Sequence, residues 1–384
     1  MPSCSPSSFS CFSCGPTASS ACARRRRGCD AMRGSIVADF LKRHFTLIVL
    51  LGGALLVCLA VQAIGDKPLI RTVTEILIRI VIVVALYIFI GNSGVVSFGS
   101  IAFVMIGAYA SAWQTCCKAM KPMSMTGLPD FLRYNTYPVF AAALTSSLLA
   151  AMVALIVGLP ILRLSGIPAS IATLAFLSIV YVVYSNWTTV TLGLLSVVGL
   201  PLYVTIWVAF GWAAATILAA YLFQNSRFGL SLRASREDEV AARAGGVNVA
   251  FQRLLAWVLS AFFLGAAGVL YGHFVGVISV NMFYFDMTFI SIAMLVVGGM
   301  RSLSGAVVGT VVLSAVTDIL RRVEAGIDIG GLSISIPPGS QEVALGLIML
   351  VLLLMRANGL MGAREFSWPR RRIEAAPASR VGSD

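Results

Sequence analysis

The sequence predicts an all-α protein, a polytopic bundle of about ten transmembrane helices with both termini in the cytoplasm. Of its 384 residues, 58% are hydrophobic and 11% are charged, whereas a soluble domain carries roughly 25% charged residues. Apolar stretches of about 20 residues recur along the chain, and this is the length that a helix needs to cross a bilayer. The net charge of +12 therefore indicates topology, and nucleic acid is not an expected partner.

The two ends of the chain differ in composition from its apolar part. Residues 1–31 are rich in Ser, Cys and Arg and predict a low-complexity tail, which is either disordered or precedes the true start at Met32. Cys11 and Cys14 form a CxxC pair, but no His or second pair completes a zinc pattern, so no metal site is expected. Residues 32–362 form one predicted transmembrane domain, and residues 363–384 form a basic cytoplasmic tail.

Ten membrane segments are predicted within this domain. In order, they are residues 45–64, 73–90, 91–115, 138–162, 165–186, 202–223, 254–275, 286–300, 303–320 and 342–355. Six segments precede the central polar stretch and four follow it, so this stretch and both basic ends share one side. That side carries most of the 28 Lys and Arg residues, and the positive-inside rule makes it the cytoplasm.

The central polar stretch, residues 224–253, is called the island below. It holds five arginines against three acidic residues, and a segment this polar cannot lie in hydrocarbon. Within it, residues 235–244 predict a short helix that Ser235 caps and that Gly245 and Gly246 end. Its small residues, among them Ala241, suit it to docking a cytoplasmic partner, and the alternative is a solvated loop between two spans.

Two segments rich in Gly and Ser begin membrane segments, GNSGVVSFGS (91–100) and GGMRSLSGAVVG (298–309). Broken helices at membrane depth are tolerated where protein or a water-filled path lines them. These segments therefore predict either the lining of a translocation path or close helix packing. The candidate path residues are Gly91, Gly94, Ser97, Gly99, Gly298, Gly299 and Ser302. The four-residue spacing from Gly268 to Gly272 predicts close packing of another helix.

Few ionisable residues lie within the predicted spans. Glu75 and Arg79, one helical turn apart, are expected to neutralise each other. His273 and Asp318 are expected to form helix–helix hydrogen bonds and not a proton relay. No phosphate-binding loop of the form GxxxxGK[ST] occurs, so this chain is expected to bind no nucleotide or other cofactor and to be no enzyme.

Several motifs in order resemble the permease subunits of branched-chain amino-acid ABC transporters, of the LivM-like type. They are GNSGVVSFGSIAFVMIGAYASA, RLSGIPASIATLAF, SRFGLSLRASREDEVAARAGGVNV, LLAWVLSAFFLGAAGVLYGHFVGVIS, LVVGGMRSLSGAVVG and NGLMG. The chain departs from the family pattern at Ser100, Gly245, Arg301 and Ala306. The resemblance covers residues 32–362 and implies a lipid-embedded subunit of a bacterial inner membrane.

This resemblance also implies partners and a coupling site. The implied partners are a second, LivH-like permease, two cytoplasmic ATPase subunits that bind ATP, and a periplasmic substrate-binding protein. Residues 237–246 would be the coupling helix that seats in an ATPase cleft. The candidate coupling residues are Arg236, Glu237, Glu239, Ala241, Ala242 and Gly246.

The substrate and the energy source stay open at this point. The same resemblance extends to permeases of ABC importers for urea, amides and aromatic acids. A secondary transporter would work from this chain alone, and a membrane redox protein would use the N-terminal cysteines. The expected mechanism is alternating access, in which ATP-driven closure of the ATPase subunits reaches the bundle through the coupling helix.

Overall fold

The structure is a computed structural model of the chain. It describes residues 45–116, 121, 125–164, 166–324, 327–329, 332–334, 339, 343–344, 346–347, 350, 359–362 and 365. Contacts group residues 49–365 into one compact unit and residues 1–48 with 366–384 into another, and only the first residues of α2 are described in the second unit. The predicted tails, 1–31 and all of 363–384 but Glu365, lie outside the described residues.

The all-α class and the polytopic architecture are confirmed. Within the described ranges, eight helices are long and apolar enough to cross a membrane. They are α2 (Phe45–Ile64), α3 (Lys67–Ser93), α7 (Val139–Ile161), α8 (Ile167–Asn186), α10 (Ile206–Asn225), α13 (Val249–Val275), η1 with α14 (Val280–Phe283 and Phe285–Gly298), and α15 (Leu303–Glu324).

The predicted third segment contains a shorter helix than expected. Helix α3 continues to Ser93 and ends at Gly94, whose φ of 72° is left-handed, and α4 begins only at Ile101 and runs to Thr115. Residues 94–100 between them form no helix, because a left-handed residue breaks the hydrogen-bond ladder. The predicted tenth segment, 342–355, lies largely outside the described residues.

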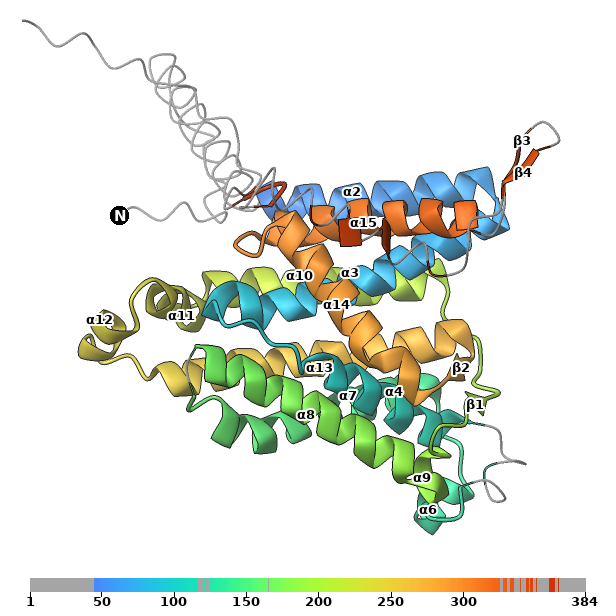
Figure 1. The fold of residues 1–384 in the computed structure, drawn as a ribbon, viewed down its shortest axis with the longest axis horizontal. Helices are drawn as coiled ribbons and strands as arrows, with labels where there is room; N and C mark the ends of the chain where they lie inside the picture. The colour runs from blue at the N-terminus through green and yellow to red at the C-terminus, as the bar shows by residue number, and fades with distance from the viewer. Residues whose placement is uncertain are drawn as a thin grey trace, which may run out of the picture. The chain divides into compact units, whose positions relative to one another are not determined.

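The remaining elements are short. They are α6 (Asp130–Arg133), α9 (Thr188–Thr191), α11 (Arg227–Glu237), α12 (Glu239–Ala244), β1 (Val197–Val198), β2 (Val277–Ile278), β3 (Ile327–Ile329) and β4 (Leu332–Ile334). The strands form two antiparallel pairs, β1 with β2 and β3 with β4. Figure 1 shows α11 and α12 at one end of the 49–365 unit, with β1, β2, α6 and α9 at the opposite end.

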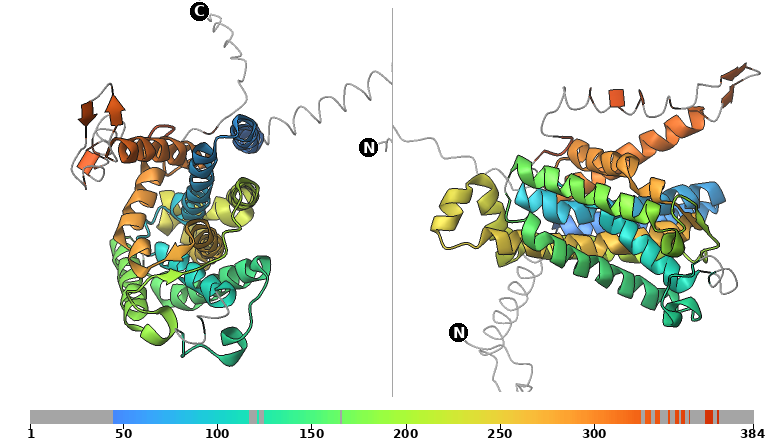
Figure 2. Two further views of the ribbon diagram at one scale, coloured as in Figure 1. Left: turned by 90° about the vertical axis from the view of Figure 1, so that its right-hand side faces the viewer. Right: turned by 60° about the horizontal axis from the view of Figure 1, so that its bottom comes forward.

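Helix α13 forms the centre of the bundle and packs on α3, α4 and α7 (Figure 2). Trp257, which is 1% exposed, anchors this core. Its ring meets Phe89 of α3 at 4.8 Å and Phe103 of α4 at 5.3 Å between centroids, both in edge-to-face geometry. Such aromatic pairs add about 0.5–1.5 kcal/mol beyond the area they bury.

Glycines set the distance between α13 and α4. A Cβ on Gly268 would overlap the Val104 carbonyl oxygen, and a Cβ on Gly107 would overlap the Gly265 backbone. The predicted small-residue packing is therefore confirmed at Gly268. Because lipid offers no hydrophobic drive for helix association, this close approach supplies the packing contacts that hold the two helices together.

Candidate functional site

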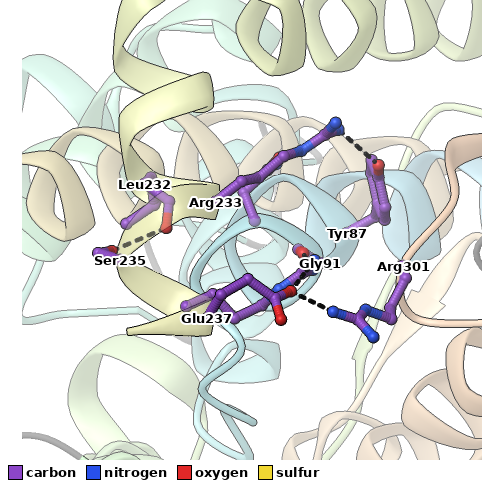
Figure 3. Close-up of polar contacts among 9 residues, drawn as sticks. Tyr87, Gly91, Leu232, Arg233, Ser235, Glu237 and Arg301 are labelled. Atoms are coloured by element: carbon purple, nitrogen blue, oxygen red, sulfur yellow. Dashed lines mark hydrogen bonds and ion pairs between the residues drawn. The ribbon is translucent and has the colours of Figure 1, made fainter. Parts of the chain in front are cut away.

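The island folds into two short helices where the sequence predicted one. Helix α11 runs from Arg227 to Glu237, and α12 follows from Glu239 to Ala244. The prediction that Ser235 caps a single helix is wrong: Ser235 lies inside α11 and donates a hydrogen bond to the Leu232 carbonyl at 2.7 Å (Figure 3).

Asp238 is the residue that caps α12. Its φ of −149° is extended, and its Oδ1 accepts the backbone N–H groups of Val240 and Ala241 at 2.9 Å each. A carboxylate in this position satisfies two donors that have no partner within the helix, and its negative charge is favourable at the positive end of the helix dipole. At the other end Gly245 caps α12 and Gly246 has a φ of 82°, so the predicted termination is confirmed.

Helix α12 presents an apolar face away from the bundle. Val240 is 79% exposed, and Ala241 beside it is exposed as well. Sequence analysis missed Val240, although a valine within a charged run is itself a signal. The Val240 and Ala241 side chains lie outside the membrane-spanning segments and are accessible to another protein.

Glu239 ties α12 to the rest of the chain. Its carboxylate contacts Arg243 at 2.5 Å and Arg253, in the first turns of α13, at 3.0 Å. Burial alone would raise the pKa of Glu239, but the hydrogen bonds and charges of Arg253 and Arg243 outweigh it and lower this pKa. Glu239 therefore holds α12 against the start of α13. A substitution at this residue would disturb that contact as well as any contact with a partner.

A hydrogen-bond network with a buried core fixes α11 to the ends of two spanning helices next to the island. Arg233 donates to Asn92 Oδ1 at 2.8 Å, to Gln224 Oε1 at 2.9 Å and to the Tyr87 hydroxyl at 3.2 Å. The Tyr87 hydroxyl donates in turn to Gln224 Oε1 at 2.9 Å. Tyr87 and Asn92 are fully buried, and Gln224 is nearly so. These hydrogen bonds join α11 to α3 and α10.

Arg236 links the island to the first glycine segment. Its Nη1 donates to the Gly91 carbonyl at 2.5 Å, and its aliphatic stem lies where a Cβ on Gly94 would be. Two sets of residues that the sequence predicted separately, coupling and path candidates, therefore meet here. Glycine at 94 is required twice, for the left-handed φ and for the contact.

Glu237 links the island to the turn between α14 and α15 through an ion pair with Arg301 (Figure 3). Arg236 contacts the same carboxylate at 3.2 Å. Hydrogen bonds from Arg301 and Arg236 lower the pKa of Glu237. A lowered pKa keeps the carboxylate charged even somewhat below its ordinary pKa of 4.5, so this link persists across neutral pH and is lost only in more acidic solution.

The other path candidates pack against backbone. A Cβ on Gly99 would overlap the Thr173 carbonyl, and a Cβ on Gly298 would overlap the Gly305 backbone. Gly299 lies so close to Gly359 that a Cβ on Gly359 would overlap its backbone. Ser97 Oγ accepts from Ser100 at 2.8 Å. The lining of a path by these residues stays a prediction.

Residues 359–362 of the NGLMG segment pack on the α14–α15 turn. Leu360 N donates to Val297 O at 2.8 Å and Met361 N to Gly298 O at 3.1 Å, while Ser302 Oγ donates to Gly362 O at 3.3 Å. The first two of these hydrogen bonds supply partners for the last carbonyls of α14, which have none within the helix. Sequence analysis gave no signal for this contact because it joins segments far apart in the chain.

The intramembrane ionisable residues are paired as predicted. Arg79 contacts Glu75 at 2.6 Å. His273 Nε2 lies 2.9 Å from Thr115 Oγ1 on α4, and Thr72 on α3 donates to Asp318 Oδ2 at 3.4 Å. Among the described residues, no group of three or more His, Cys, Asp or Glu side chains could hold a metal ion.

The ion pair between Glu237 and Arg301 gives a charge-swap prediction. Arg301→Glu should place two carboxylates together, separate α11 from the α14–α15 turn and lower uptake several-fold. The double variant Glu237→Arg with Arg301→Glu should recover most of this loss. Uptake into vesicles, compared at equal amounts of inserted protein, measures both. A double variant no better than Arg301→Glu alone would refute a direct link.

Comparison with known proteins gives one family. The family model described as branched-chain amino acid transport system / permease component matches residues 69–355. The chain is 25% identical to the high-affinity branched-chain amino acid transport system permease protein LivM of Escherichia coli K12, and the match covers 75% of this chain and 68% of that protein. LivM of Salmonella typhimurium matches with the same identity and coverage. A probable LivH permease of Methanocaldococcus jannaschii is 37% identical over 89 residues, 23% of this chain and 27% of that protein. No solved structure matches.

Proposed function

The chain belongs to the family of branched-chain amino acid transport permease components, and from this premise we propose that it is the transmembrane subunit of an ATP-driven importer of branched-chain amino acids. It is a multi-pass protein of the bacterial inner membrane, and its relatives are transport permeases. The observation that best supports an ATP-driven mechanism is α12, a capped helix with exposed Val240 and Ala241 at the end of the bundle.

In this proposal α12 is the coupling helix, and its exposed apolar face seats in a cleft of a cytoplasmic ATPase subunit. The importer also contains a second permease, a second ATPase subunit and a periplasmic binding protein, and ATP binds at the ATPase subunits. The ATPase must contact α12 differently in its two states, because a ligand shifts an equilibrium only through differential affinity. Arg233 and Arg236 pass the movement of α11 to α3 and α10 through the hydrogen bonds described above.

The proposal predicts that Ala241→Trp lowers transport while membrane insertion stays normal. The indole would occupy the surface that contacts the ATPase, while the bundle is unaffected because Ala241 is exposed. Uptake should fall at least about tenfold, the equivalent of about 1.4 kcal/mol, with normal membrane insertion. Ala241→Ser is the matched control, since its side chain stays small, and it should retain uptake.

Labelled leucine and labelled urea, offered to vesicles with the complete importer and ATP, test the substrate. Leucine uptake that depends on ATP is expected. Urea uptake without leucine uptake would place the chain with urea or amide importers. Flux through this subunit reconstituted alone would identify a secondary transporter, and normal uptake by a correctly inserted Ala241→Trp complex would count against docking at α12.

A further inference from the structure

A polar hollow lies between α3 and α15, away from the island. Its volume is about 250 Å³ including its open side, and its enclosed part is about the size of one water molecule. The polar groups that line it comprise two carboxylates, two guanidinium groups and hydroxyls. They include Thr72, Glu75, Arg79, Ser314, Asp318 and Arg321.

The hollow lies near the membrane face opposite the island. Helix α3 reaches the island at Gly91, which accepts from Arg236, and α15 starts at the turn that holds Arg301, which pairs with Glu237. At about 1.5 Å per residue, Glu75 and Asp318 lie about 22–24 Å along their helices from that side. The hydrocarbon core is about 30 Å thick. If the island is cytoplasmic, the hollow faces the side from which an imported substrate arrives.

Two acidic and two basic side chains line the hollow, but some of their polar atoms have no partner. Glu75 pairs with Arg79 at 2.6 Å through Oε1, and Asp318 meets Arg322 at 3.3 Å through Oδ2. In the described part of the chain, Glu75 Oε2 and Asp318 Oδ1 accept no hydrogen bond, and Arg321, which is exposed at the open side, forms neither a hydrogen bond nor an ion pair.

Ser314 adds an independent observation. It is 1% exposed, it lines the hollow, and its Oγ has no hydrogen-bond partner among the described residues. A buried hydroxyl without a partner costs about 1–3 kcal/mol. Charged side chains at membrane depth are also costly, and they commonly mark a substrate pathway. A ligand that uses the hydroxyl and both charge signs would offset these costs.

We infer that this hollow receives the charged head group of a zwitterion, as in a free α-amino acid, on its way into the permease. The substrate carboxylate binds Arg321 directly and the buried Ser314 hydroxyl through the one water molecule that the enclosed part can hold, and the ammonium group binds Asp318 and Glu75. The head group lies at the open side of the hollow, because the enclosed part has room for only about one water molecule, and the aliphatic side chain stays outside. A neutral urea or amide would form an ion pair with neither the acidic nor the basic side chains. An aromatic acid carries only a carboxylate and would pair only with Arg321. This inference rests on the proposed function and narrows its substrate class.

Thermal unfolding of the full chain, purified with the subunits that accompany it but without the soluble binding protein, tests the inference. L-leucine at tens of millimolar should raise Tm by roughly 2 °C. 4-Methylpentanoate lacks the ammonium group and 3-methylbutylamine lacks the carboxylate, so neither should do so. Asp318→Asn should abolish the leucine shift, whereas Asp286→Asn, an exposed aspartate at the start of α14 that does not line the hollow, should keep it.

Ser314→Ala is the second variant, and it carries the test if Asp318→Asn does not fold. It removes one hydroxyl from a small side chain and should weaken leucine binding about fivefold to tenfold. Equal shifts with all three compounds, no shift with leucine, or an unchanged shift in Ser314→Ala would each overturn the inference and leave only a water site. ATP-driven leucine uptake by the same complex reports separately on the proposed function, so either can fail alone.

Discussion

Arg233→Met is expected to destabilise the protein by about 3–5 kcal/mol and to abolish uptake. The substitution removes three hydrogen bonds from a guanidinium group and leaves Asn92 Oδ1 buried without its partner. Contributions within one hydrogen-bond network are not additive, and removing one partner of a buried charged contact typically costs about 3–5 kcal/mol in all. Helix α11 would then lose its attachment to α3 and α10, and with it the route from α12 into the bundle.

Thermal unfolding of the purified complex and uptake into vesicles measure these two effects. Arg227→Met is the matched control: the same substitution lies in the same helix, but Arg227 is exposed and should tolerate it. Arg233→Lys should fall between the two, because an ammonium group cannot reproduce the planar fork that reaches three acceptors. Equal behaviour of Arg233→Met and Arg227→Met would show that the network does not hold α11.

Gly268→Val should prevent assembly of the bundle. The Cβ would overlap the Val104 carbonyl oxygen on α4, and both sides of this contact are backbone, so neither can move without shifting a helix. Overpacking a core commonly costs about 1–3 kcal/mol, and a backbone clash at the central crossing belongs at or above the upper end. Little folded protein should reach the membrane.

Gly211→Val separates this clash from the intrinsic effect of valine in a helix. Gly211 lies within α10, and nothing lies within 4 Å of a Cβ placed there. Both variants replace glycine by valine within a helix, so the difference in intrinsic helix propensity affects the stability of both equally. The yield of folded protein, measured by size-exclusion chromatography in detergent, should collapse for Gly268→Val alone. Similar yields for the two variants would remove the packing role assigned to Gly268.

Much of the fold could be predicted because a membrane segment can be identified from its own run of apolar residues. The first predicted segment has the same bounds as α2, and those of α7, α8 and α15 begin within two residues of the prediction. Glycine spacing also predicted close helix packing at Gly268, and the structure identified α4 as the helix that packs there. Errors occurred where one residue competes with another for the same role, as when Asp238 replaced Ser235 as the cap of α12. Pattern alone does not rank two capping residues three positions apart.

The sequence by itself determined the class, the order of the spans, the polar island and the family resemblance, because each rests on local composition or on motifs along the chain. Only the tertiary structure decided which residues meet: Arg233 with Asn92 and Tyr87, Glu237 with Arg301, and Asp318 with Thr72. The physical reason is that these contacts join residues far apart in sequence. Their partners follow from how the helices cross, and a pattern read along one chain contains no record of those crossings.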